Sequence, residues 1–176
     1  MELNVVKDII VPILIGLLSS FLFLLLASRV RPHLDISPHI AKMPPEGCVR
    51  PQIGYAVKVV NSSRRSATEI RARLALVQKL EVGGGLINQT DDFLLVKNEV
   101  FELPGWNAKR AEDSAFRFIT YDDIEPNWKG SNYIEFSISA KDSLSGFSRV
   151  YSRQYYLKRD VMKDGTFEIG ESMRIA

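Results

Sequence analysis

The sequence predicts a mainly β protein, either an antiparallel β-sandwich or a small barrel, preceded by one N-terminal transmembrane helix. Three observations support this class. The 176 residues suffice for one modest domain plus an appendage, and 45% hydrophobic with 25% charged residues excludes a wholly disordered chain. The first 27 residues are far more apolar than the rest. Behind them, about eight short stretches alternate apolar and polar residues between turns.

Charge and cysteine content narrow the class further. The 23 basic and 21 acidic residues leave a net charge of +2, so no overall field favours nucleic acid as the partner. Cys48 is the single cysteine, which excludes an intrachain disulfide and fits a reducing compartment.

The N-terminal helix is predicted over Ile9–Ala27, nineteen residues without a charge. At about 1.5 Å per residue this run spans roughly 28 Å, enough to cross a bilayer once. A cleaved signal peptide is the alternative, but the run is too long, no A-x-A site follows, and Arg29 and Arg31 close it directly. Pro12 is expected in the first helical turn, and Pro32 is expected to stop the helix.

Basic residues near the span predict its orientation. Lys7 alone precedes the helix, whereas Arg29, Arg31 and Lys42 follow it. Under the positive-inside rule, the C-terminal domain faces the cytoplasm, and a bacterial inner membrane is the expected location. The unpaired Cys48 agrees with this side of the membrane.

Inside the span, Gly16 and Ser20 are four residues apart and offer a weak small-xxx-small pattern for a homo-oligomer formed through the anchor. A plain lipid-facing helix is the favoured interpretation. The span contains no ionisable residue, so one copy is expected to tether the protein and not to conduct ions.

We divide the chain into an N-terminal tail (1–8), the transmembrane helix (9–27), a juxtamembrane segment with a first edge strand and a loop (28–51) and the remaining β domain (52–176). Alternation predicts strands over 34–40 and 55–60. Residues 66–82 fit two patterns, a helix with a Ser66-x-x-Glu69 capping box or an alternating strand. The strand, in a hairpin with 55–60, is favoured.

The rest of the chain reads as further short strands and turns. The clearest pattern is a hairpin, in which Ile134, Phe136, Ile138 and Ala140 share one face and 147–157 returns after a turn. The other expected elements are strands over 92–96, 100–103, 115–120 and 166–169, and one or two helical turns within 121–128.

This organisation resembles single-pass bacterial membrane proteins that display an immunoglobulin-like β-sandwich on the cytoplasmic side. The resemblance covers the architecture of most of the chain and no particular motif, since no second cysteine is present to pair with Cys48.

Catalytic and metal-binding patterns are weak. His33, His39 and Cys48 match no tight metal-ligand spacing, so we expect no metal site and no cofactor. Ser145 lacks the surroundings of a nucleophile elbow, and Gly83–Gly85 is not followed by the Lys-Ser or Lys-Thr of a phosphate loop. The acidic pairs at 91–92, 112–113 and 122–123 are expected in solvated loops. We therefore do not expect an enzyme.

The best candidate for ligand binding is the stripe formed by Arg149, Tyr151, Arg153 and Tyr155, which project to one face of the returning strand. Guanidinium groups interleaved with phenol rings can hold an anionic ligand. The favoured alternative is a solvated sheet face whose tyrosines cover the arginine stems and neighbours such as Glu135.

The sequence therefore predicts a non-enzymatic interaction or sensing module, held by the lipid bilayer at the cytoplasmic face. Its expected partner is a cytoplasmic protein or a small anionic ligand. The alternative is a ligand-sensing membrane effector that oligomerises and perturbs the bilayer, by analogy with antiviral effectors that join membrane helices to a β domain.

Overall fold

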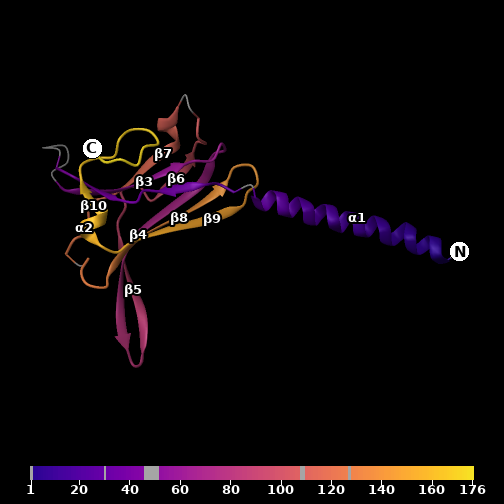
Figure 1. Cartoon of the computed structure of the whole chain (residues 1–176), viewed down its shortest axis with the longest axis horizontal. Coiled ribbons are helices and arrows are strands. Elements are labelled where there is room, and N and C mark those ends of the chain that lie inside the picture. The colour runs from indigo at the N-terminus through magenta and orange to yellow at the C-terminus, as the bar shows by residue number, and fades with distance from the viewer. Residues whose placement is uncertain (1, 30, 46–51, 108–109, 127) are drawn as a thin grey trace.

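The computed structural model describes residues 2–29, 31–45, 52–107, 110–126 and 128–176. It consists of one long N-terminal helix followed by a mainly β domain built from two sheets (Figure 1). Cys48 and its predicted interpretation lie outside the described residues, as does the side chain of Arg29.

Helix α1 (Glu2–Arg29) extends away from the β domain (Figure 1). Its segment Lys7–Leu26 has a mean hydropathy of 2.8 and is long and apolar enough to cross a membrane. The helix begins before the predicted span, so Pro12 lies in its interior and not in its first turn as predicted. The missing N–H of Pro12 leaves the backbone carbonyl of Asp8 without its usual intrahelical donor.

The first sheet is centred on β3 (Gly54–Asn61). On one edge, β3 pairs with β1 (Leu34–Ile36) and then with β2 (Ile40–Met43), and on the other edge it pairs with β7 (Ala115–Thr120). The predicted first strand over 34–40 is therefore two strands. Pro38 separates them because it has no N–H to give to a ladder. A further strand, β10 (Met162–Asp164), pairs in parallel with β2.

The second sheet is centred on β4 (Ala67–Val82), which confirms a strand over 66–82. One edge of β4 pairs with β8 (Tyr133–Asp142), and β8 with β9 (Ser148–Tyr155). The other edge of β4 pairs with β6 (Glu99–Leu103) and with β5 (Gly85–Phe93). The predicted hairpin between 55–60 and 66–82 is wrong, because β3 and β4 belong to different sheets.

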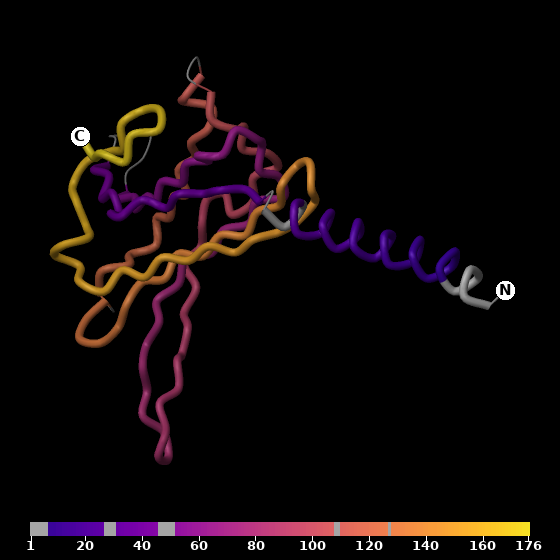
Figure 2. Tube along the Cα trace, turned by 45° about the vertical axis from the view of Figure 1, so that its right-hand side comes forward, coloured from indigo at the N-terminus to yellow at the C-terminus, as the bar shows by residue number. Residues whose placement is uncertain are grey.

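Beyond the sheet, β4 and β5 continue as a two-stranded arm (Figure 2). Val77 is the last residue of β4 that pairs with β8, and the β4–β5 ladder runs on to Val82 and Gly85. Gly83 and Gly84 form the turn, both with positive φ. Four large apolar side chains of the arm are exposed: Leu80, Val82, Leu86 and Ile87.

One hydrophobic core lies between the two sheets. From the first sheet it takes residues such as Val57 and Phe118, and from the second Leu74 and Phe136. The rings of Phe118 and Phe136, 5.5 Å apart, join the two layers. Tyr155 of β9 belongs to the same cluster.

The C-terminal segment 165–176 covers the outer face of the first sheet, where Phe167 packs against Ala41, Met43 and Ala56. The segment folds back on itself, because Thr166 and Ala176 exchange two backbone hydrogen bonds of 2.9 Å. Under this cover lies Lys58, which is 1% exposed.

Other expected elements are partly corrected. The strands over 100–103 and 115–120 and the hairpin at 134–157 are confirmed as β6, β7, β8 and β9. The strand expected over 92–96 is only partly present, since β5 ends at Phe93 and Leu95 forms an isolated bridge with Thr120. The described part of 121–128 contains no helix, only a turn in which the N–H of Trp128 donates to the carbonyl of Glu125 at 3.3 Å. Residues 166–169 form only the single bridge Phe167–Ile175. The short helices Ala111–Ser114 and α2 (Lys158–Val161) were not predicted.

Candidate binding groove

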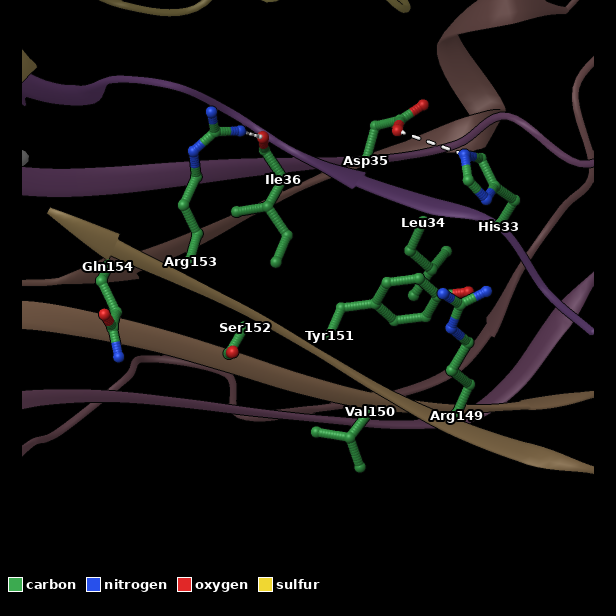
Figure 3. A pocket seen from close by; sticks show the side chains of 10 residues that line it. All are labelled: His33, Leu34, Asp35, Ile36, Arg149, Val150, Tyr151, Ser152, Arg153 and Gln154. Atoms are coloured by element: carbon green, nitrogen blue, oxygen red, sulfur yellow. Dashed lines mark hydrogen bonds and ion pairs between the residues drawn. The ribbon is translucent and has the colours of Figure 1, made fainter.

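A groove of about 630 Å³ lies between β1 of the first sheet and β9 of the second (Figure 3). Both are edge strands, since among the described residues β1 pairs with β3 and β9 with β8. The groove therefore follows the open side of the two-sheet structure. Its walls are formed by residues 33–36 and 149–154.

The predicted stripe faces this groove and the core. Each of its residues stands opposite an apolar residue of β8, in the pairs Arg149–Ala140, Tyr151–Ile138, Arg153–Phe136 and Tyr155–Ile134. Opposite residues of two strands share a face, so the stripe projects inward from the sheet. The favoured interpretation, a solvated face neighbouring Glu135, is thus wrong in its direction and its neighbour, although Arg149 and Arg153 keep exposed side chains. Glu135 pairs with Gln154 on the other face and accepts a hydrogen bond from its amide at 2.9 Å.

The two tyrosines connect the sheets. Tyr155 is 1% exposed, and its hydroxyl donates to the carbonyl oxygen of Ser37 at 2.7 Å. The hydroxyl of Tyr151 donates to the carbonyl of Pro32. Burial raises the pKa of both hydroxyls above the usual tyrosine value, which keeps them protonated as donors. These tyrosines therefore hold β9 against the chain that leaves α1.

The two arginines differ. The guanidinium of Arg153 donates to the carbonyl oxygen of Ile36 at 2.6 Å, so it satisfies an edge group of β1. Both residues are exposed, but within the described part of the chain Arg149 has no such carbonyl contact and stacks on the ring of Tyr151, 4.9 Å from the ring centre (Figure 3). Of the stripe, Arg149 is the residue best placed to meet a ligand, and Arg153 and Tyr155 hold the groove in shape.

The mouth of the groove also carries an imidazole and a carboxylate. Nε2 of His33 lies 3.6 Å from a carboxylate oxygen of Asp35, and both side chains are largely exposed. The arginines outnumber this single acid, so the groove favours a negatively charged segment. The free edge of β9 adds backbone groups that an extended chain can use for pairing.

The remaining sequence candidates are not brought together at this site. Within the described residues, no group of three His, Cys, Asp or Glu side chains is placed to hold a metal ion. The amide of Ser145 donates to Asp142, which fixes the β8–β9 turn. In α1 the hydroxyl of Ser20 donates to the carbonyl of Gly16 at 2.9 Å.

Two of the three acidic pairs have structural partners, and the third, Glu112 and Asp113, is exposed on the short helix Ala111–Ser114. Asp92 binds Arg73, Asp91 accepts from Gln78, Asp122 accepts from the amide of Leu94, and Asp123 accepts from Tyr55.

A charged network at the opposite end of the domain was missed by the sequence analysis. Glu125 accepts from Lys42 at 2.5 Å, from Tyr55 at 3.0 Å and from Lys158. Hydrogen bonds from Lys158 and Lys42 lower the pKa of Glu125 to about 2. No sequence pattern links these residues, because they come from four separate elements.

Comparison with known proteins adds little to this geometry. No family model and no curated protein matches the chain. Among solved structures, the chain is similar to the sporulation control protein Spo0M from Bacillus subtilis, with 12% sequence identity and a TM-score of 0.40. The match covers 71% of this chain and 48% of that protein, so the chain spans about half its length. At this level of similarity we derive no function from it.

Proposed function

We propose that this protein is a single-pass membrane protein whose β domain is a non-enzymatic interaction module in the cytoplasm. In this proposal an extended, acidic segment of a partner protein binds in the groove between β1 and β9. The groove is the main support for this proposal. It combines the free edge of β9 with the exposed side chain of Arg149, and its other wall, β1, follows α1 closely in the chain.

We further propose an immunoglobulin-like β-sandwich in preference to a closed barrel. The support is that β1 and β9 meet through the side chains of Tyr151, Arg153 and Tyr155 and not through a backbone ladder. A barrel would need a continuous ladder at this position.

The proposed orientation rests on the basic residues after α1. Fusing a reporter after Ala176 through a flexible linker is expected to show it in the cytoplasm. Replacing Arg29 and Arg31 with neutral residues and adding lysines before Ile9 is expected to invert or mix the orientation. An external reporter on the wild-type chain would contradict the proposed topology.

Partner chemistry follows from the groove. A peptide that adds to β9 uses backbone hydrogen bonds for affinity and alternate side chains for specificity. Carboxylates on the inward-facing side of such a peptide would meet Arg149. Because Arg149 is exposed, this attraction should weaken as salt increases.

The test uses the full chain in phosphatidylcholine nanodiscs and two labelled octapeptides, one alternating Glu and Val and the other alternating Lys and Val. Fluorescence anisotropy should show salt-sensitive binding of the acidic peptide and much weaker binding of the basic one. Arg149→Gln should weaken acidic-peptide binding several-fold. Equal binding of the two peptides would contradict the proposed partner chemistry.

The matched control is Arg159→Gln. Arg159 lies on α2 at the end of the domain opposite α1, and its side chain is 90% exposed (Figure 1). It removes the same charge without touching the groove, so peptide binding should stay at the wild-type level. Equal losses in both variants would show that overall charge, and not the groove, attracts the peptide.

A further inference from the structure

The end of the β domain that joins α1 is formed by three turns. After β3, Ser62 donates from its backbone N–H to the carbonyl of His33 at 3.0 Å. The same turn, residues 62–66, accepts backbone hydrogen bonds from Trp106 at 2.7 Å and from Ser143 at 3.2 Å. The turns that follow β6 and β8 are therefore hydrogen-bonded to the turn that follows β3, and that turn is bonded to the chain that follows α1.

This end exposes two large apolar side chains. Leu144 is at the tip of the β8–β9 turn and is 76% exposed, and Trp106 is 38% exposed. The indole N–H of Trp106 donates to Glu171, so the ring is held in place. Tryptophan and leucine at a loop tip suit the boundary between headgroups and acyl chains.

This end carries exposed arginines, while acids beside them have basic partners: Glu69 lies 3.1 Å from Lys141, and Asp35 lies 3.6 Å from His33. Arg31 and Arg64 are exposed. The buried acid of the region, Asp142, is neutralised by Arg65, whose Nε lies 3.1 Å from it. Exposed arginines beside an apolar tip complement an anionic lipid surface.

The turn that carries Leu144 and the turn that carries Trp106 are both fixed in shape. A carboxylate oxygen of Asp142 accepts from the amides of Leu144 at 3.0 Å and Ser145 at 2.8 Å. Gly105 packs so closely on the neighbouring turn that an added Cβ would lie 2.4 Å from the backbone carbon of Arg64. The apolar tip is thus presented by a rigid frame and needs little ordering to bind.

We propose that this end of the domain docks on the anionic headgroups of the same bilayer that α1 enters. Leu144 and Trp106 enter the interfacial layer, and Arg64 lies at the phosphate level. The inference rests on the proposed function, in which α1 spans the membrane. A lipid surface is favoured over a protein because His33 follows Arg29 by four residues, which keeps His33 within roughly 14 Å of chain from the helix end. The turn with Arg64 is bonded to His33, and the turns with Trp106 and Leu144 are bonded to that turn.

The experiment reconstitutes the full chain in liposomes of phosphatidylcholine alone or with 30% phosphatidylglycerol, each with a headgroup spin-labelled lipid as quencher. The two tryptophans provide signal and reference, since Trp106 lies at the docking end and Trp128 is buried at the far end. Stronger quenching is expected in the anionic liposomes, and Trp106→Phe should abolish the difference.

Two variants test the contacts. Leu144→Ser and Arg64→Gln should each reduce the docked population, Arg64→Gln by roughly fivefold in the docking equilibrium. Their matched controls are Leu157→Ser, an exposed leucine beside α2, and Arg159→Gln. Both controls should quench like the wild-type chain.

Extraction with alkaline carbonate separates the two proposals. Release of the chain from the liposomes would contradict both the proposed membrane anchor and the proposed docking surface. A chain that resists extraction but shows equal Trp106 quenching in both lipid mixtures, or unchanged quenching in Leu144→Ser and Arg64→Gln, overturns the docking surface and leaves the anchor intact.

Discussion

The two sheets present opposite kinds of outer face. On the first sheet, Ala56 and Lys58 are buried under the C-terminal segment 165–176. On the second sheet, the charged outward residues remain in contact with solvent, as in the ion pair of Arg73 with Asp92, although Ala75 and Val77 beside them are buried. The same alternation along a strand therefore leads to burial in one sheet and exposure in the other, depending on what the rest of the chain supplies.

The covered face shows how a lysine can be buried in a strand. Lys58 Nζ donates to the carbonyl oxygens of Glu168 at 2.7 Å and Ser172 at 2.6 Å. It also lies 6.0 Å from the centre of the Phe167 ring. The segment thus supplies acceptors as well as apolar cover, which a buried ammonium group requires.

The largest expected change in stability comes from removing Phe167, the apolar residue that covers the first sheet. Phe167→Ala should destabilise the domain by about 3–4 kcal/mol, because it leaves a cavity against Ala41, Met43 and Ala56. Urea unfolding of the full chain in detergent micelles would measure the change. A loss below about 1 kcal/mol would show that the segment is not a true part of the core.

Replacing the buried lysine should have a smaller effect. Lys58→Met keeps most of the side-chain volume but leaves the carbonyls of Glu168 and Ser172 without this donor, at a cost of about 1–3 kcal/mol. Removal of the buried charge offsets part of this cost. Hydrogen exchange should accelerate at Thr166 and Ala176, whose amides close the segment. Unchanged hydrogen exchange at these amides would show that Lys58 does not hold the C-terminal segment 165–176 in place.

The charged network around Glu125 is a third kind of polar site, and its effect on stability can be measured through pH. The pKa of Glu125 is lowered to about 2, first by its hydrogen bond from Lys158. A lowered carboxylate pKa contributes stability that is present above pH 4.5 and is lost as the pH falls toward 2. After allowance for solvent screening, this amounts to about 1–2 kcal/mol. Unfolding at pH 7 and pH 3 should show the loss, and Glu125→Gln should largely remove it.

The contribution of Lys58 to stability should also depend on pH, but here the cause is burial of the charged group and not hydrogen bonding to it. Burial lowers its pKa, so below pH 10.5 the unfolded chain binds more protons at this site than the folded chain. Its contribution to stability therefore rises with pH between the lowered value and 10.5. Comparison of the pH dependence of unfolding in wild type and Lys58→Met, as the pH rises toward 10.5, isolates this slope. Parallel curves would contradict the burial of a charged Lys58.

The smallest effect is expected on the open face. Arg73→Gln breaks the pair with Asp92, which lies 2.6 Å away, but both side chains are more than half exposed. Such pairs contribute about 0–1 kcal/mol and less at high salt. Unfolding should hardly change, and a loss above 2 kcal/mol would mean that this face is covered in solution.

Several elements of the fold were predictable because one face of each strand is consistently apolar. The β8–β9 hairpin was found from Ile134, Phe136 and Ile138, whose alternation marks an inward face. The strand β5 was missed because it lies in the exposed arm and has no inward face to mark. The helical turns expected within 121–128 failed because local propensity there yields to contacts of Asp122 and Asp123 with distant residues.

The site was only half predictable. Spacing placed the stripe on one face of β9, but its direction depends on the register across the β8–β9 turn, which sets Tyr151 against Ile138. The hydrogen-bond partner of Arg153 is the backbone carbonyl of Ile36, and a backbone acceptor of this kind cannot be predicted from a pattern of side chains. Burial of Lys58 was equally hidden, since its acceptors are more than 100 residues away in the sequence.

The pairing of β2 with β10 has a consequence for how the protein is made. Residues 40–42 find their parallel neighbours at 162–164, and the cover over Lys58 comes later still. Strands β4 to β9 are all contained within 67–155, so during synthesis the second sheet has its strands before the ribosome releases the last residues. The first sheet starts beside the helix, but it is completed only when residues 162–176 have been made. A chain truncated before Met162 would therefore contain every strand of the second sheet, β9 included, but would lack the parallel neighbour of β2 and the cover over Lys58.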